Sequence, residues 1–156
     1  MKKLLIIALF MVSAQAAFSQ YYHKNSYSSR SKAVTFQVAP TVVDFDGVKF
    51  GFGFGMNIKQ VISINYFHTR DYGVNDEQPY LDNRFAGFHL SIAQPLTESI
   101  ELAVGARKGT LNSEFQKAIF TGEVRYKFNE SWRLVFEYGG NSEKDMASMR
   151  LVFNLY

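Results

Sequence analysis

Residues 48–58, "VKFGFGFGMNI", constrain the fold of this chain more than any other stretch. Large side chains stand at every second position, and the positions between them hold mostly glycine. A period of two is typical of a β-strand whose two faces differ. Glycine weakens a strand and adds no packing to a face that meets water. The stretch therefore predicts a strand with one apolar face and one face that has very little room.

The same alternation recurs along the chain, and no segment sustains the stripe of an amphipathic helix. Eight strands are predicted, at about residues 33–43, 48–58, 61–69, 84–94, 99–108, 117–128, 131–138 and 146–156. Pro40 lies inside the first of them, where the missing backbone N–H predicts a bulge or a local break in the pairing.

The connections between these strands alternate in length. Short turns are predicted at 59–60, 95–98 and 129–130, and longer loops at 70–83, 109–116 and 139–145. The first connection, 44–47, is short and contains Asp-Gly, a strong hairpin signal. A meander with an even number of strands places the short turns at one end and the longer loops at the other. Outer-membrane barrels show this asymmetry.

Three architectures could use this alternation: a soluble sandwich, a soluble ligand-binding barrel and a membrane barrel. The apolar face carries too many large side chains for the interior of an eight-stranded soluble barrel. The other face reads Gly51, Gly53, Gly55 and, further on, His89 and Ser91, which does not suit the solvent side of a sandwich. We therefore predict an all-β fold, an eight-stranded antiparallel up-and-down transmembrane β-barrel, with a soluble β-sandwich as the alternative.

The charged residues support this orientation. Within the strands they fall on the small-residue face, and only the titratable His68 is predicted on the apolar face. A charge that faces lipid at mid-depth costs ~2–4 kcal/mol, so its absence there is expected. Aromatic residues gather near the strand ends, as in the interfacial girdles of membrane barrels. They are Tyr126, Phe128 and Trp132 near the short turns, and Phe50, Tyr66, Phe120 and Tyr138 near the long loops.

The charges on the small-residue face predict an ion-pair network in the barrel interior. Its members are Glu101, Arg107, Glu123, Arg125, Lys127, Arg133, Glu137 and Arg150. Pairing the strands around loop 109–116 sets Glu101 opposite Arg125 and brings Arg107 near Glu123. The alternative is a set of independently solvated charges, which a narrow closed interior disfavours.

The first residues read as a secretory signal peptide. "MKKLLIIALFMVSAQAAFSQ" has a basic start, a short apolar run and small residues before two candidate cleavage sites, after Ala16 and after Ser19. We expect a signal peptide at 1–19, a flexible periplasmic lead-in at 20–32 and the barrel at 33–156. Export and the barrel pattern together predict the outer membrane of a Gram-negative bacterium.

The signal peptide, the eight alternating strands and the aromatic C-terminal residue resemble the small outer-membrane β-barrels of the OmpX/OmpA type. The "AFSQ" junction and the Gly/aromatic repeats resemble members from Bacteroidetes. The resemblance implies the fold, the location, contact with outer-membrane lipids and insertion by the barrel-assembly machinery. One departure concerns the last strand, where Tyr156 is in phase with Asn154 and Arg150, whereas Leu155 and Phe153 form the apolar row.

Other chemistry finds little support. Without Lys2 and Lys3 the 17 basic residues fall to 15 against 14 acidic ones, so no electrostatic footprint for nucleic acid is present. "GFGFG" lacks the spacing of a phosphate-binding loop. His68 with Asp71, and His89 with Ser91, do not form a recognisable nucleophile-and-base set. No catalytic, cofactor-binding or metal-ligating residue is predicted.

The function expected from the sequence is a structural or surface-interaction role through the extracellular loops. Loop 70–83 is the longest, and loops on a rigid scaffold are where recognition usually occurs. It holds exposed acids and tyrosines that could contact an unidentified surface partner: Asp71, Tyr72, Asp76, Glu77, Tyr80 and Asp82. The alternatives are a lipid-modifying enzyme and a narrow pore.

Overall fold

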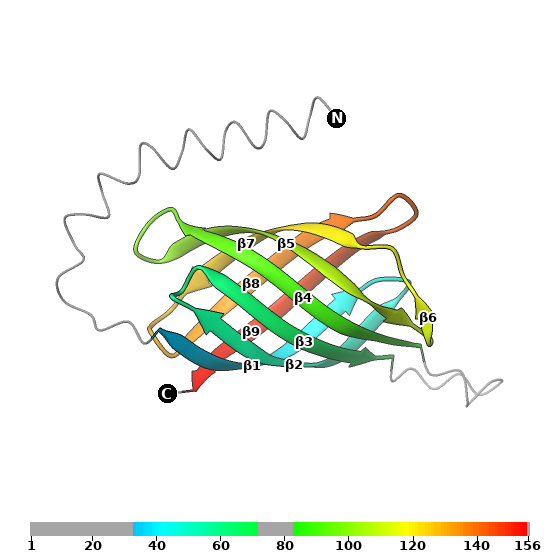
Figure 1. The fold of residues 1–156 in the computed structure, drawn as a ribbon, viewed down its shortest axis with the longest axis horizontal. Coiled ribbons are helices and arrows are strands. Elements are labelled where there is room, and N and C mark those ends of the chain that lie inside the picture. Colours follow the sequence, from blue (N-terminus) through cyan, green and yellow to red (C-terminus); the bar gives the residue numbers. More distant parts are fainter. Residues whose placement is uncertain (1–32, 72–82, 156) are drawn as a thin grey trace, which may run out of the picture. The chain divides into compact units, whose positions relative to one another are not determined.

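The computed structural model describes residues 33–71 and 83–155, and these residues form a closed antiparallel β-barrel (Figure 1). The strands are β1 Val34–Asp44, β2 Val48–Ile58, β3 Ile62–Arg70, β4 Arg84–Pro95, β5 Ile100–Leu111, β6 Glu114–Phe115, β7 Ile119–Lys127, β8 Trp132–Gly140 and β9 Asp145–Leu155. β1 pairs with β9 and closes the wall, whereas the two-residue β6 pairs only with β5. Eight strands therefore form the wall, as predicted. The described residues include no helix long and apolar enough to cross a membrane.

The main differences from the predicted strand limits lie around β6. β5 continues to Leu111 and turns back through Asn112 and Ser113, which both have positive φ angles of 52° and 72°. A two-residue hairpin turn requires this conformation at both positions. Asn-Ser lacks the glycine that usually marks such a turn, and for this reason a single loop at 109–116 was predicted instead of a hairpin. The next wall strand accordingly begins at Ile119 rather than at 117.

The strands of the wall are strongly staggered. The chain of directly paired residues that starts at Val34 runs through Ile58, Ile62, Ile92, Val104, Gly122, Tyr138 and Ala147 and returns to β1 at Asp44. It therefore starts at one end of β1 and finishes at the other. A stagger of this size accompanies strands tilted by about 35–45° to the barrel axis.

Pro40 produces a local break and no bulge. Its pairing with Phe52 on β2 is uninterrupted. On the β9 side the register is the same before and after Pro40, but the pairing is missing at Ala39 and Pro40. The absent N–H of proline explains the gap, since it cannot donate to β9.

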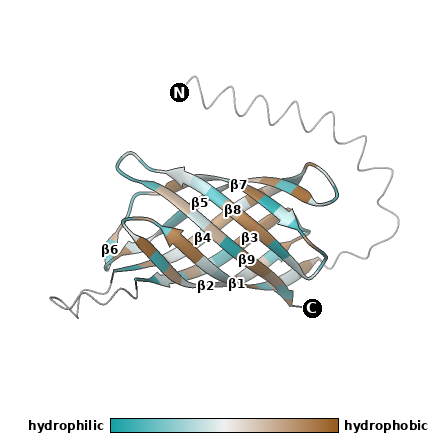
Figure 2. Ribbon diagram, turned by 180° about the vertical axis from the view of Figure 1, so that it is seen from behind, coloured by the Kyte–Doolittle hydropathy of each residue, from teal (hydrophilic) through white to brown (hydrophobic). Residues whose placement is uncertain are grey.

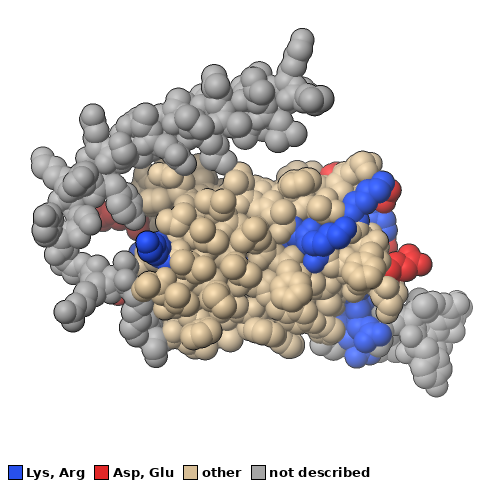
Figure 3. All heavy atoms as spheres, viewed as in Figure 1, with Lys and Arg blue, Asp and Glu red and all other residues tan. Residues whose placement is uncertain are grey.

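The two faces of the wall differ as the alternation predicted. Hydrophobic and hydrophilic residues alternate along the strands (Figure 2), and charged side chains on the face seen in Figure 3 gather towards the two ends. Large outward side chains include Phe36, Phe52, Phe54, Phe88, Leu90, Ile92, Leu102, Val104, Val124 and Phe136, each at least 41% exposed. At the short-turn end the rings of Phe128 and Trp132 are stacked, with centroids 4.1 Å apart.

The expectation that only His68 breaks the apolar face is wrong at the loop end. Lys108 and Arg84 are exposed there on the outward face, in phase with Phe88 and other apolar neighbours. Asp44 is exposed at the corresponding end of β1. These positions lie where the strands extend towards the loops, so their charges can be hydrated.

Close contact with β3 explains the glycines of β2 more directly than the narrow interior does. A Cβ atom on Gly51 would lie 2.6 Å from the Cα of Thr69, and one on Gly55 would lie 2.6 Å from the Cα of Asn65. Real side chains essentially never approach backbone this closely. Glycine at these positions therefore allows β2 and β3 to approach each other where the wall curves.

Candidate functional site

The barrel interior is the candidate site, because the inward positions of the strands hold almost all the buried polar side chains. The charged ones among them are Lys49, Glu101, Arg107, Glu123, Arg125, Arg133, Glu137 and Arg150, together with His89. Alternation along each strand turns these side chains inward, and the stagger of the wall sets their heights. Together with buried apolar residues, they fill the interior in three layers from the short turns to the loops.

The middle layer is a compact ion-pair cluster around two carboxylates. Glu123 on β7 lies directly opposite Glu137 on β8, and neither side chain is exposed. Arg107 forms a bidentate pair with Glu137, with Nε 2.9 Å and Nη2 2.5 Å from its two oxygens. Arg125 binds Glu123 through a single oxygen, with its Nε 2.8 Å and its Nη2 2.7 Å from Oε2. Nη2 of Arg150 lies 3.1 Å from Glu123 and 3.3 Å from Glu137, so Arg150 connects the two carboxylates.

His89 completes this cluster from the opposite side of the barrel. Its Nε2 lies 2.9 Å from Oε1 of Glu123, and its Nδ1 lies 3.3 Å from Nη1 of Arg150. This geometry suits the neutral imidazole with the proton on Nε2, because Nδ1 then accepts from the guanidinium. This role of His89 could not be predicted, because the alternation assigns His89 to a face but does not determine its height in the barrel.

The same three residues could in principle hold a metal ion. Donor atoms of His89, Glu123 and Glu137 all lie within 4.8 Å of one another. Both carboxylates, however, already carry bidentate or bridging guanidinium groups from Arg107 and Arg150. These arginines supply the positive charge that a cation would bring, so the arrangement fits an ion-pair network better than a metal centre.

The layer at the short-turn end is a second ion-pair group. Oε2 of Glu101 lies 3.1 Å from Nη1 of Arg133 and 4.0 Å from Nη1 of Arg125, its directly paired residue on β7. Asn154 joins this layer, because its Oδ1 accepts from Gln37 at 2.8 Å and from Arg133 at 3.3 Å. The layer links β1, β5, β7, β8 and β9 across the interior.

The layer at the loop end is an apolar plug, which the sequence analysis missed. It consists of Val43, Phe45, Phe67, Phe85, Leu111, Ile119 and Met146, all buried. The ring centroids of Phe45 and Phe67 each lie 4.7 Å from that of Phe85. The guanidinium of Arg107 stacks over Phe67 at 4.7 Å and so connects the plug to the middle layer. The plug residues lie at inward positions. The inward face was predicted to hold mainly small and charged residues, so a large apolar cluster there was not expected.

A buried lysine holds the turn that closes the plug. Lys49 is fully buried, and its Nζ donates to the carbonyl oxygens of Phe45, Asp46 and Gly47, the last two at 2.9 Å and 3.0 Å. The turn has positive φ angles at Asp46 and Gly47. Folding of this turn over the barrel end places Phe45 among the plug residues.

The predicted network members do not all meet as expected. Arg107 pairs with Glu137 and forms no ion pair with Glu123, although the sequence argument brought it near Glu123. Lys127 is half-buried, and no ion pair of its side chain is present within the described part of the chain. In the candidate interaction loop, Tyr72, Asp76, Glu77, Tyr80 and Asp82 lie outside the described residues. Asp71 is described, and its N–H donates to the carbonyl of Asn83 at 2.9 Å.

The histidines that invited a hydrolase reading have other contacts. The hydroxyl of Ser91 accepts from Arg125 at 2.7 Å, while His89 contacts Glu123 and Arg150. His68 is half-buried on the outward face, with its ring 6.3 Å from that of Phe52. His89 therefore lies within the ion-pair cluster, and its side chain is 1% exposed.

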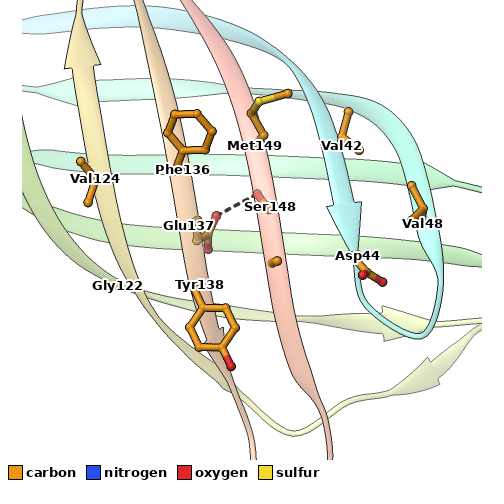
Figure 4. A pocket seen from close by; sticks show the side chains of 11 residues that line it. Val42, Asp44, Val48, Gly122, Val124, Phe136, Glu137, Tyr138, Ser148 and Met149 are labelled. Carbon is orange, nitrogen blue, oxygen red and sulfur yellow. Dashed lines mark hydrogen bonds between the residues drawn. The ribbon is translucent and has the colours of Figure 1, made fainter.

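The outward face carries one shallow hollow, of about 430 Å³ (Figure 4). It lies over β2, β1, β9, β8 and β7, where Gly122 and Ala147 are low between Phe136, Tyr138 and Met149. Asp44 stands at its edge, as Figure 4 shows. Glu137 and Ser148, whose side chains belong to the ion-pair cluster, are also among the residues that line the hollow.

Comparisons with known proteins identify the fold. No protein-family model matches the chain, and no curated protein matches it either. Among solved structures, a barrel from a study of de novo designed transmembrane β-barrels is 15% identical and covers 78% of this chain and 95% of its own, with a TM-score of 0.60. The designed barrel TMB2.3 is 15% identical, with coverage of 82% and 99% and a TM-score of 0.61. The N-terminal β-barrel domain of Pseudomonas aeruginosa OprF is 11% identical, with coverage of 78% and 97% and a TM-score of 0.59.

At these identities the likeness concerns the fold alone. The fold of this chain is that of an eight-stranded transmembrane β-barrel.

Proposed function

We propose that this protein is a small barrel of the bacterial outer membrane with a structural or surface-interaction role through its extracellular loops. The observation that carries the proposal is the filled interior. Three layers of buried side chains, two of them ion-paired and one apolar, occupy the barrel from one end to the other. An eight-stranded barrel has an interior just wide enough for side chains. The outside of such a barrel, and above all its loops, is what other molecules can reach.

The location rests on the outward face and on the N-terminal segment. A wide apolar belt between charged ends suits a bilayer, and the segment 1–19, which lies outside the described residues, has the composition of a signal peptide. Outer-membrane lipids and the barrel-assembly machinery are the partners this proposal requires. A surface partner would meet loop 70–83, whose acids and tyrosines offer charge and aromatic area.

Two measurements test the role. In planar bilayers the purified barrel should give no steady conductance, and with labelled phospholipid or lipid A it should release no product. Stable single-channel steps would favour the narrow pore, and turnover that is lost in a His89→Ala variant would favour a lipid-modifying enzyme.

A third measurement tests the surface role itself. An epitope tag inserted between Val74 and Asp76 should be accessible to antibody on intact cells. Replacement of residues 72–81 by a Gly/Ser linker should remove a surface phenotype while the barrel stays folded. A tag that is reached only after the outer membrane is permeabilised would contradict the proposed orientation.

A further inference from the structure

At the loop end, the charges on the outward positions of the eight wall strands are divided by sign around the barrel, and the exposed Glu114 lies on β6, outside the wall. On β1 and β9 they are acidic, at Asp44 and Asp145. On β3, β4 and β5, which are adjacent to one another, they are basic, at Arg70, Arg84 and Lys108. We call these three residues the basic arc. An even mixture of signs would be enough to keep the rim hydrated, so the division calls for a separate cause.

Two members of the basic arc face each other directly. Arg70 on β3 and Arg84 on β4 are paired in register, and both stand on the outward face. Like charges at directly opposite positions destabilise an antiparallel pair. Arg84 is exposed, and its backbone is fixed by Asn112, whose side-chain oxygen accepts from the Arg84 N–H at 2.8 Å. The two guanidinium groups therefore present positive charge from adjacent, well-held strands.

The third member extends the arc above the apolar belt. Lys108 on β5 is exposed, and its paired residue on β4 is Phe88, which is 63% exposed. The Lys108 ammonium donates to the carbonyl of Gln116 at 2.9 Å, which leaves it two further N–H groups. Between Arg84 and Phe88 the outward position is the small Ala86. The basic arc therefore borders the apolar belt. On β4 the small side chain of Ala86 leaves a shallow depression between Arg84 and Phe88.

We propose that the basic arc binds the anionic, phosphate-bearing headgroup of a lipid in the leaflet that surrounds the loop end. The inference rests on the proposed function, since it needs the barrel to span a membrane. Guanidinium groups match phosphate in geometry as well as charge, and a lysine adds a point charge. The acyl chains of the same lipid would pack on the belt beneath, around Phe88 and Leu90.

The hollow on the other side of the barrel does not compete for this lipid. Its edge carries Asp44, and Asp145 lies two positions along β9 from its lining residue Ala147. A phosphate would be repelled there. The charge division therefore sets on which side of the barrel an anionic lipid is held.

The test uses the full-length mature barrel in phosphatidylcholine nanodiscs that contain a small fraction of phosphatidic acid. Native mass spectrometry then counts the lipids that stay bound. The variant Arg84→Gln with Lys108→Gln removes two charges of the arc, and Arg70 is left unchanged because it has other interactions. The matched control, Lys59→Gln with Lys117→Gln, removes two exposed lysines elsewhere, one of them at the loop end. A charge-preserving variant, Arg84→Lys with Lys108→Arg, serves as the second comparison.

We expect the wild-type barrel, the control and the charge-preserving variant to retain phosphatidic acid in preference to phosphatidylcholine. The arc variant should bind it about 25-fold more weakly, because each of the two basic residues removed contributes roughly fivefold in affinity near an anionic surface. Equal retention by the arc variant and the control, or no preference in the wild type, would overturn the site. A wild-type chain that enters no bilayer at all, with no shift between boiled and unboiled bands on a gel, would instead contradict the proposed function.

Discussion

Glu123 and Glu137 lie directly opposite each other on adjacent strands, fully buried, and share one guanidinium group, that of Arg150. Two like charges in this position would repel strongly in a medium of low polarity. Each carboxylate also has an arginine of its own, Arg125 for Glu123 and Arg107 for Glu137. The cluster is therefore held by mutual compensation, and the removal of one member leaves its partners uncompensated.

Neutralising one carboxylate should be costly. Glu123→Gln leaves Arg125 and Arg150 short of a partner, and breaking a buried pair in this way typically costs ~3–5 kcal/mol. Urea unfolding in lipid vesicles, followed by the shift between folded and unfolded bands, measures the loss. Glu114→Gln, at an exposed position of β6, is the matched control and should change the free energy of unfolding by less than about 0.5 kcal/mol. Equal effects of the two substitutions would exclude the network.

The cluster should also behave as a unit. Glu137→Gln and Arg150→Gln remove groups 3.3 Å apart, so their combined cost should fall short of the sum of the single costs by about 1–3 kcal/mol. A double-mutant cycle of unfolding free energies measures this coupling. If the two losses of unfolding free energy simply add, Arg150 and Glu137 do not stabilise the barrel through their contact with each other.

The apolar plug should stabilise the barrel from within. Phe85→Ala empties space between Phe45 and Phe67, and a buried Phe→Ala change typically costs ~3–5 kcal/mol. Phe88→Ala lies on the same strand but on the outward face, where lipid can fill the space, and should cost clearly less. The same unfolding assay compares the two. A larger cost for Phe88→Ala would contradict the assignment of the faces.

One ion pair at the loop end should give a small acid dependence. Lys144 lies 2.9 Å from Asp46, and its hydrogen bond holds the pKa of this carboxyl group below the ordinary value. A lowered carboxyl pKa contributes stability above the unfolded value, which is lost as the pH falls towards the folded value. Asp46→Asn should therefore lower the free energy of unfolding at pH 7 by about 0.5 kcal/mol and have no effect below about pH 3. Asparagine also tolerates the positive φ at this turn. If the difference in unfolding free energy between the wild type and Asp46→Asn is the same at all pH values, the Asp46–Lys144 ion pair is not the cause of that difference.

The fold was predictable because a period of two assigns each side chain to a face. It was enough to place Glu101 opposite Arg125, since both lie on neighbouring strands joined by one loop. It was not enough to pair Arg107 with Glu137, because a long side chain can cross the interior to a strand that is not its neighbour. The plug was missed for a related reason. The period identifies Phe67 and Phe85 as inward but does not give their height, and the height decides whether they meet.

The central claim is that the outward face of the wall meets lipid while the inward face meets a filled interior. The chain has no cysteine, so single cysteines can be introduced along β4 from Ala86 to Ala93 and spin-labelled in vesicles. Their collision rates with lipid-soluble oxygen and with a water-soluble nickel complex measure the two environments. We predict high oxygen and low nickel accessibility at Phe88, Leu90 and Ile92, and low accessibility to both at His89 and Ser91. High nickel accessibility at Phe88, Leu90 and Ile92 would contradict the membrane barrel, and high nickel accessibility at His89 and Ser91 would contradict the filled interior.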